Sequence, residues 1–203
     1  MKLLIPNAKE LNTNQDAFSY QELSQKPQAI LDILTNFSVE DLTNFYKINS
    51  NKAEQDYLDE HLRIATAFYG LVKPTDLIAP HRLDFQGKLK IGKTSLKQFW
   101  REDYDKVVQD DDLIISLLSS EFEQVFSPDI RKRMIKIIFM ENRAGKLKIH
   151  STISKKGRGR LVSLMAEKQI ETLEDIKTLS FDGFSFSLEH SDDKTITFIR
   201  DGE

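Results

Sequence analysis

Apolar positions along the chain change repeatedly between helical and strand spacing. Apolar residues three or four positions apart predict a helix over residues 53–69, which Gly70 is placed to end. The same spacing predicts a helix over residues 94–108, capped by Thr94 or Ser95.

The second half of the chain carries the strands. Continuous apolar runs over residues 112–118 and 134–140 have strand length, and a short helical pattern over residues 121–126 separates them. A turn at residues 142–145 leads into a further strand over residues 146–153, whose lysines share one face.

The remaining predicted elements extend the same alternation to both ends of the chain. They are a strand at residues 2–5, a helix starting at Pro27, a helix after the capping box at residues 38–41, a helix from Ser154 to Met165, a short helix from Thr172, and strands at residues 184–188 and 195–200 that pair. Interleaved strands and helices predict the α/β (mixed α+β) class, with one mixed central sheet flanked by helices. We expect a single domain over residues 1–203.

Composition limits the cellular setting and the chemistry. The chain has 39% hydrophobic and 30% charged residues, as ordinary globular proteins have, and it contains no cysteine. Disulfides, thiolate catalysis and thiolate metal sites are therefore excluded. The apolar run Leu3–Ile5 stops at Pro6, which is too short for a signal sequence, and no stretch approaches a membrane span. We expect a cytoplasmic protein that does not bind membranes.

Charge is distributed very unevenly along the chain. Eleven Lys or Arg residues lie between Arg131 and Arg160 against one acid, Glu141, which leaves 18 basic and 31 acidic residues elsewhere. This segregation favours an anionic ligand, most commonly a phosphate backbone. The plain alternative is a solvated basic surface without a ligand, and the sequence pI of about 5.9 is far below that of dedicated nucleic-acid-binding domains.

The densest part of this segment is its end. Two glycines among the cations of residues 155–160 would let the main chain approach a phosphate closely, and a helix beginning nearby would add its positive end. Cations at a helix N-terminus oppose the helix dipole, which hints at a compensating anion. The alternative is a basic first turn on an exposed helix.

A specific family resemblance begins at residues 68–84. This segment resembles the YaaA family of bacterial peroxide stress proteins, whose members carry a tyrosine-glycine turn, a basic residue, proline, aspartate, and a second proline followed by arginine and leucine. Further landmarks agree in order: Pro6–Lys9, His61–Arg63, Gln98–Trp100, Ser119–Phe122 and Lys155–Gly159. The resemblance therefore covers nearly the whole chain.

The chain departs from the family pattern at several positions. His81 stands where the family usually has tyrosine, Lys73 where arginine is common, and Gly157 where alanine is common. Family members also carry several tens of additional residues between the counterparts of Lys52 and Tyr57. Either the segment is deleted here or it is absent from the sequence as given. We favour the second interpretation, because the missing part includes helical sequence that the family ordinarily keeps.

The resemblance implies a cytoplasmic protein induced by hydrogen peroxide that limits iron-linked damage, with an α/β domain unlike the common superfolds. It also implies DNA binding through a basic cleft, with a helix-hairpin-helix element. Gly70, followed by Pro74 and Asp76, could form such a hairpin, because a glycine lets backbone N–H groups approach phosphate. The alternative for Gly70 is a plain helix C-cap.

The predicted nucleic-acid contacts come from both lines of reasoning, and all are expected to contact phosphate without reading bases. They are Lys9, Lys73 and Arg82 from matching family positions, Lys146 and Lys148 from the strand face, and Lys155, Lys156, Arg158 and Arg160 from the densest basic segment.

Enzymatic patterns are weaker. Ser191 and Lys194 have a serine-lysine spacing but lie in a polar turn, where nothing would desolvate the lysine. Asp175 and Lys177 resemble the end of a nuclease site but lack a second carboxylate. The four histidines are scattered without helical pairing, so we expect no catalytic residues, no cofactor and no preformed metal site.

One further polar group invites a small-molecule interpretation. His81 and Arg82, placed near Asp76 or Asp84, could bind a phosphorylated small molecule, although a structural salt-bridge cluster is the commoner outcome for such residues.

Three functional hypotheses follow. The first is a monomeric or weakly associating protein of peroxide defence that binds duplex DNA without sequence preference. The second is an enzyme acting on a phosphorylated or nucleotide ligand, held by the same cations in a closed pocket with Asp76 or Glu121. The third is a protein-interaction partner that uses its acidic surface and shows an exposed apolar patch.

Overall fold

The computed structural model describes residues 1–7, 51–76, 78 and 83–202. The helices predicted to start at Pro27 and after residue 41 lie outside these residues. So do Lys9, His81 and Arg82.

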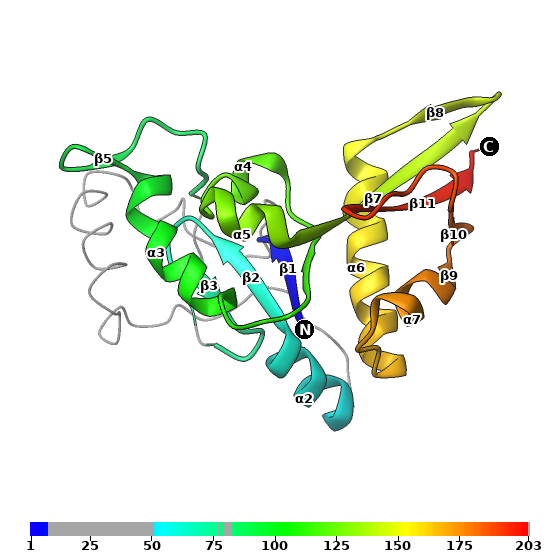
Figure 1. The fold of residues 1–203 in the computed structure, drawn as a ribbon, viewed down its shortest axis with the longest axis horizontal. Helices are drawn as coiled ribbons and strands as arrows, with labels where there is room; N and C mark the ends of the chain where they lie inside the picture. Colours follow the sequence, from blue (N-terminus) through cyan, green and yellow to red (C-terminus); the bar gives the residue numbers. More distant parts are fainter. Residues whose placement is uncertain (8–50, 77, 79–82, 203) are drawn as a thin grey trace, which may run out of the picture.

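A single mixed sheet organises the described part of the chain (Figure 1). Its nine strands run in the order β3-β2-β1-β6-β7-β11-β10-β9, with β8 paired to β7. The strands are β1 (Lys2–Pro6), β2 (Leu62–Thr66), β3 (Gly70–Val72), β6 (Ile114–Ser116), β7 (Met134–Arg143), β8 (Lys146–Lys148), β9 (Ser180–Phe181), β10 (Phe184–Phe186) and β11 (Thr195–Asp201). A separate small ribbon pairs β4 (Lys90–Ile91) with β5 (Thr94–Ser95). The predicted α/β class with a mixed central sheet is confirmed.

Five central strands, β2, β1, β6, β7 and β11, are parallel, and antiparallel strands flank them. Helices cover both faces of this parallel core. They are α2 (Lys52–His61), α6 (Ser151–Lys168) and α7 (Leu173–Thr178) on one face, and α3 (Leu96–Val108), α4 (Ser120–Glu123) and α5 (Pro128–Arg133) on the other.

Alternation along the buried strands explains the two layers. Leu3 packs under the first group of helices and Leu4 under the second, and Ile115 and Ile114 divide in the same way. Strands that are covered on both faces read as continuous apolar runs, which is why the runs at 112–118 and 134–140 identified β6 and β7 correctly.

The connections between neighbouring strands differ from a simple repeat of βαβ units. The chain passes from β6 to β7 through α4 and α5 on one face, and from β7 to β11 through α6 and α7 on the other. In a regular series of right-handed crossovers running in one direction, both connections would lie on the same face. The sheet is therefore not a standard doubly wound arrangement.

Several local predictions are confirmed in detail. Ser95 caps α3 in a capping box with Gln98, and Thr172 caps α7 by accepting from the Asp175 N–H. The β7–β8 turn consists of Ala144 and Gly145, both with positive φ, as two-residue hairpin turns require. β10 and β11 pair as predicted.

The predicted helix over residues 53–69 is wrong in its second half. α2 ends at His61, and the chain continues directly into β2, which lies between β1 and β3. Because β2 is buried on both faces, its apolar residues imitate a helical spacing, and tertiary packing decides the outcome. Gly70 therefore opens β3 with φ of +82° and does not lie between two helices, so the helix-hairpin-helix interpretation of this segment is also wrong.

The start of α6 also differs from the prediction. The helix begins at Ser151 with His150 as N-cap, so Ser154 is an interior, buried position and not the cap. Lys155 and the following cations consequently lie beyond the first turn, not at the helix N-terminus.

Gly157 has a packing role inside α6. A Cβ atom at this position would lie 2.8 Å from the ring of Phe139 on β7. That ring cannot move aside easily, because Phe181, Phe184 and Phe198 surround it. Close approach of helix and sheet, and not approach of main chain to phosphate, accounts for this glycine.

We predict opposite effects for alanine at the two helical glycines. Gly157→Ala should destabilise the protein, because overpacking costs about 1–3 kcal/mol, more than the helix propensity gained. Gly159→Ala, whose Cβ would meet nothing within 4 Å, should stabilise it by about 0.5–1 kcal/mol. Urea unfolding of both variants measures the difference, and equal shifts of the midpoint in one direction would refute the packing role.

Candidate functional site

The most distinctive feature of the sheet is a step between two adjacent parallel strands. β6 ends at Ser116, which pairs with Lys136, whereas β7 continues to Arg143. Pairing of β7 with β8 starts only at Glu141. Within the described residues, the edge of β7 at residues 137–140 therefore has no strand partner on this side.

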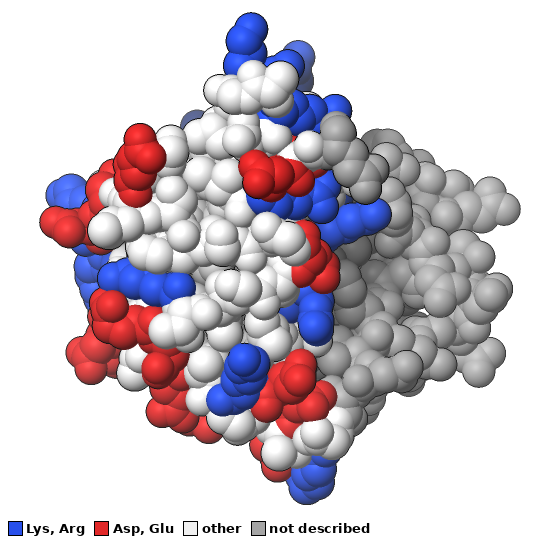
Figure 2. Space-filling model, turned by 90° about the vertical axis from the view of Figure 1, so that its right-hand side faces the viewer, with Lys and Arg blue, Asp and Glu red and all other residues white. Residues whose placement is uncertain are grey.

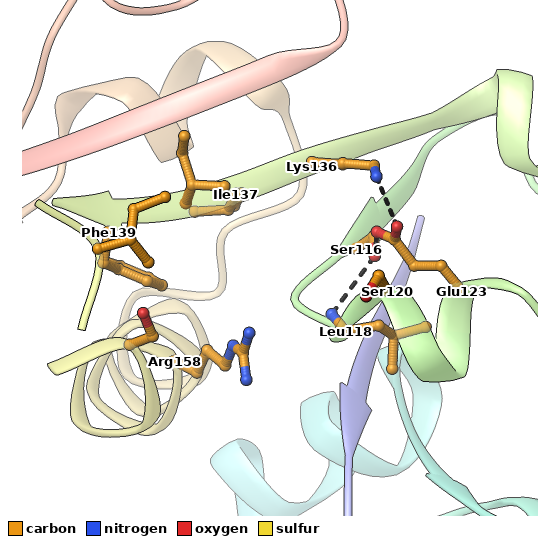
Figure 3. Close-up of a pocket in the computed structure, with 11 residues that line it drawn as sticks. Ser116, Leu118, Ser120, Glu123, Lys136, Ile137, Phe139 and Arg158 are labelled. Atoms are coloured by element: carbon orange, nitrogen blue, oxygen red, sulfur yellow. Dashed lines mark hydrogen bonds and ion pairs between the residues drawn. The ribbon is translucent and has the colours of Figure 1, made fainter. Parts of the chain in front are cut away.

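A cavity of about 170 Å³ lies at this step (Figure 3). Side chains from both faces of the sheet meet there, because α4 comes from one face and α6 from the other. The lining consists of Ser116, Leu118, Ser120, Glu123, Lys136, Ile137, Ile138, Phe139, Ile149, Ser154 and Arg158.

The topology favours ligand binding at this end of the sheet. Counted alone and in chain order, the five parallel strands have the order 2-1-3-4-5, and the direction of the connections changes between β1 and β6. Open α/β sheets bind ligands outside the carboxyl ends of their strands. The cavity lies at this end of β6, between β6 and β7, and so one strand away from the change of direction.

A buried carboxylate organises the wall of the cavity. Glu123 is only 6% exposed, and its Oε1 accepts a hydrogen bond of 2.8 Å from the Ser116 hydroxyl. The Lys136 ammonium donates to its Oε2 at 2.5 Å. A buried charge needs such compensation. Lys136 remains about half exposed, so its ammonium also faces solvent and the cavity.

The second acid of α4 has a different role. Glu121, also buried, accepts hydrogen bonds from the Phe85 N–H at 2.8 Å and from Gln86 Nε2 at 2.9 Å. It thereby holds the loop at Phe85 and Gln86 in place, and it does not line the cavity. Asp76 closes a turn by accepting from the Lys73 N–H. Neither acid joins Arg158 in the cavity, as the enzyme hypothesis required.

The predicted nucleic-acid contacts do not form one group. Lys73 lies beyond the end of β3, next to the start of β2, and therefore at the opposite end of the parallel strands from α4 and the start of α6. Its ammonium pairs with Asp59 at 3.1 Å. Hydrogen bonds from Thr75 and Lys73 lower the pKa of Asp59, so this acid is ionised and neutralises Lys73. Lys9 and Arg82 lie outside the described residues.

Four lysines on β8 and α6 remain exposed and without an acidic partner among the described residues. Lys146 and Lys148 on β8 and Lys155 and Lys156 on α6 are exposed, and within the described residues none of them forms an ion pair. The two elements follow one another in the chain, with β8 leading into the start of α6 (Figure 1). We call these four residues the lysine strip.

The two arginines of the same segment behave differently. Arg158 lines the cavity, with its guanidinium extending from α6 toward the end of β6 (Figure 3). Arg160 lies 4.0 Å from Asp182.

Acids from elsewhere in the chain neutralise much of the rest of the basic segment. Lys132 pairs with Asp129, and Lys136 with Glu123. Figure 2 shows the outcome on the face that carries β8 to β11: basic and acidic side chains alternate around a largely uncharged centre, and basic ones gather at the top, where Figure 1 places the β7–β8 hairpin.

Glu141, the single acid of the basic segment, is the charge that fixes this hairpin. It is 2% exposed and pairs with Arg143 and, at 2.9 Å, with Arg200. Burial alone would raise the pKa of Glu141, but the hydrogen bonds and charges of Arg200 and Arg143 outweigh burial and lower it. Two more cations are thereby removed from any anion-binding surface.

The sequence did not reveal four residues that line the cavity as members of one site. Ser116, Glu123 and Lys136 were not singled out at all, and Ser154 was expected to cap a helix and not to face inward. One signal was present for Lys136, because it is the only charged residue in the apolar run 134–140, and a lysine in a buried strand requires a partner. The step between β6 and β7 has no signature in the sequence, since it depends on which strands pair.

The described part of the chain lacks two further features. No helix there is long and apolar enough to cross a membrane. No group of three or more His, Asp or Glu side chains there is arranged to hold a metal ion.

Comparison with known proteins places the chain in a sequence family. Residues 50–190 match the family model described as peroxide stress protein YaaA. A "UPF0246 protein" of Streptococcus agalactiae serotype Ia is 39% identical over 240 residues, covering 98% of both chains. Similar proteins of Streptococcus gordonii and of Streptococcus pneumoniae strain CGSP14 are 39% and 37% identical, covering 98% and 99% of this chain and 98% and 100% of their own.

These alignments also bear on chain length. They extend over 240 or 241 positions, more than the 203 residues of this chain. The relatives therefore contain residues without a counterpart here. That these residues belong between Lys52 and Tyr57 stays a prediction.

We predict a pH-dependent contribution of Glu141 to stability. Because the folded-state pKa is lowered, the contribution is complete above the ordinary glutamate pKa and is lost as the pH falls through the folded-state value. Glu141→Gln should therefore unfold at a lower urea concentration than the parent chain near neutral pH, and the difference should shrink in acid.

The matched control is Glu102→Gln, which removes an acid that is 78% exposed and pairs with Lys106. Exposed pairs contribute little, so this change should leave the urea midpoint nearly unchanged. Equal effects of the two substitutions across the pH range would contradict the role assigned to Glu141.

Proposed function

The chain belongs to the family of peroxide stress protein YaaA, and we propose that it serves the peroxide stress response in the cytoplasm by binding nucleic acid, most simply duplex DNA, without sequence preference. The lysine strip is the observation that carries this proposal. Its four charges have no acidic partner among the described residues.

The chemistry of the strip suits phosphate and not bases. Lysine ammonium groups on flexible stems contact phosphate as point charges, whereas base recognition relies on planar, bidentate groups such as arginine or asparagine. The strip contains only lysines. Binding should therefore depend on salt and very little on sequence.

The rest of the charge distribution would orient the protein on a polyanion. Outside residues 131–160 the chain carries 31 acidic and 18 basic residues, so most of the surface repels phosphate. Contact would be confined to the face with β8 and the start of α6. The 170 Å³ cavity is far too small for a duplex, so DNA would contact the exposed lysine strip and not enter this cavity.

We predict that Lys155→Ala/Lys156→Ala reduces the salt dependence of duplex binding. Four phosphate contacts correspond to a slope of about −3.6 in log affinity against log salt, at about −0.9 per contact, and the double variant should lower its magnitude by about 1.8. Fluorescence anisotropy with a labelled random-sequence duplex at several salt concentrations measures both slopes.

A matched control removes two lysines that already have acidic partners. Lys52 pairs with Asp56 and Lys106 with Glu102, each four residues away on exposed helices. Lys52→Ala/Lys106→Ala changes the net charge equally and should leave the slope within about 0.5 of the parent value. If both double variants change the slope equally, or the parent chain does not bind duplex at low salt, the proposal is wrong.

A further inference from the structure

The cavity beside β6 contains chemistry that surface binding of nucleic acid does not use. We infer that this cavity binds a single phosphate group, either free phosphate or the phosphate end of a small molecule. The inference does not rest on the proposed nucleic-acid binding, because the lysine strip and the cavity are formed by different side chains.

Charge in the cavity favours an anion. Among the described residues that line it, two are cations, Lys136 and Arg158, and one is an acid, Glu123. Both Glu123 oxygens already accept hydrogen bonds, from Ser116 and Lys136. An ammonium has three N–H donors, so Lys136 can hold Glu123 and still donate to a ligand. Arg158 supplies the planar, multiply donating group that suits phosphate oxygens.

A hydroxyl on the wall of the cavity adds a second, independent observation. Ser154 lines the cavity and is only 8% exposed, and its side chain forms no hydrogen bond with the described residues. Its Oγ is not among the fully buried oxygens, so it can donate its proton to a ligand oxygen in the cavity. Arg158 follows four residues later, and residues at this spacing occupy the same helix face.

The step in the sheet provides main-chain donors as well. Residues 137–140 of β7 have no strand partner on the cavity side among the described residues, and Ile137, Ile138 and Phe139 line the cavity. Alternate residues of a strand direct their N–H and C=O groups to the same edge. An oxyanion at this edge would give such an N–H group the partner that backbone groups ordinarily have.

Size restricts the ligand. Pockets for drug-sized ligands measure roughly 300–1,000 Å³, whereas this cavity measures about 170 Å³. A phosphate group fits, and the rest of a nucleotide would have to remain outside. The start of α6 at Ser151, close to the lining residues Ile149 and Ser154, adds the positive end of an 18-residue helix to the same region.

The test is isothermal titration of the full chain with inorganic phosphate at constant ionic strength. The parent chain should bind phosphate. Arg158→Gln should bind it at least about ten-fold more weakly. Ser154→Ala should bind it about three- to ten-fold more weakly, which matches the loss of one hydrogen bond. Far-UV circular dichroism and the urea midpoint establish that each variant is folded, and Ser154→Ala provides a second, milder variant.

Arg160→Gln is the matched control, because it removes the same charge two residues later on the same helix and outside the cavity lining. Arg160→Gln should bind phosphate with an affinity within about two-fold of that of the parent chain. Lys155→Ala/Lys156→Ala should do the same. A ten-fold loss of affinity corresponds to about 1.4 kcal/mol, which requires a direct interaction with the ligand that these residues do not make. The second comparison separates this site from the lysine strip, so that either proposal can fail alone.

Glycerol 3-phosphate and acetate complete the experiment. Tighter binding of glycerol 3-phosphate than of inorganic phosphate supports the site and identifies a phosphorylated small molecule, and the reverse order supports it and identifies free phosphate. Three outcomes would overturn the inference: no phosphate binding by the parent chain, equal losses in Arg158→Gln and Arg160→Gln, or acetate binding as tight as phosphate.

Discussion

The difference in length between β6 and β7 is the constraint on which the candidate sites depend. β6 ends at Ser116, and the chain turns at once into α4, which brings Glu123 back against Lys136. β7 continues because β11 and β8 pair with its further residues. The step exposes a strand edge and opens the space that α4 and α6 enclose. The longer strand β7 also forms the hairpin with β8 that leads into α6.

Three acids, two of them buried and Asp59 partly buried, determine which cations remain available. Glu123, Glu141 and Asp59 each hold at least one cation, and each comes from a different part of the fold. Their positive partners stabilise these carboxylates and are thereby removed from the anion-binding surface. Six cations of the basic segment therefore contribute to two smaller features in space, the lysine strip and the cationic wall of the cavity.

Much of the fold was predictable because the signals are local. Capping residues Ser95 and Thr172, the Ala144–Gly145 turn and the apolar runs of β6 and β7 depend on neighbours in sequence. The failures share one physical cause. Strand β2 imitated a helical spacing because both of its faces are buried, and Ser154 was assigned as a cap because its burial against the sheet has no local signal.

The candidate site was predictable only in part for the same reason. The basic segment correctly directed attention to β8 and α6, but charge along the chain does not reveal which acids arrive from other elements. The neutralisation of Lys73 by Asp59 depends on α2 meeting the end of β3, and the cavity depends on strand pairing. Both are properties of the tertiary structure.

The most direct test of this account is an NMR titration of the ¹⁵N-labelled chain with inorganic phosphate and, separately, with a short duplex. The account predicts that phosphate shifts the amide signals of Leu118 and residues 137–139 and leaves those of residues 146–148 unchanged. The duplex should shift the signals of residues 146–148 and leave those of residues 137–139 unchanged. Identical sets of shifted signals for the two ligands, or no response of residues 137–139 to phosphate, would contradict it.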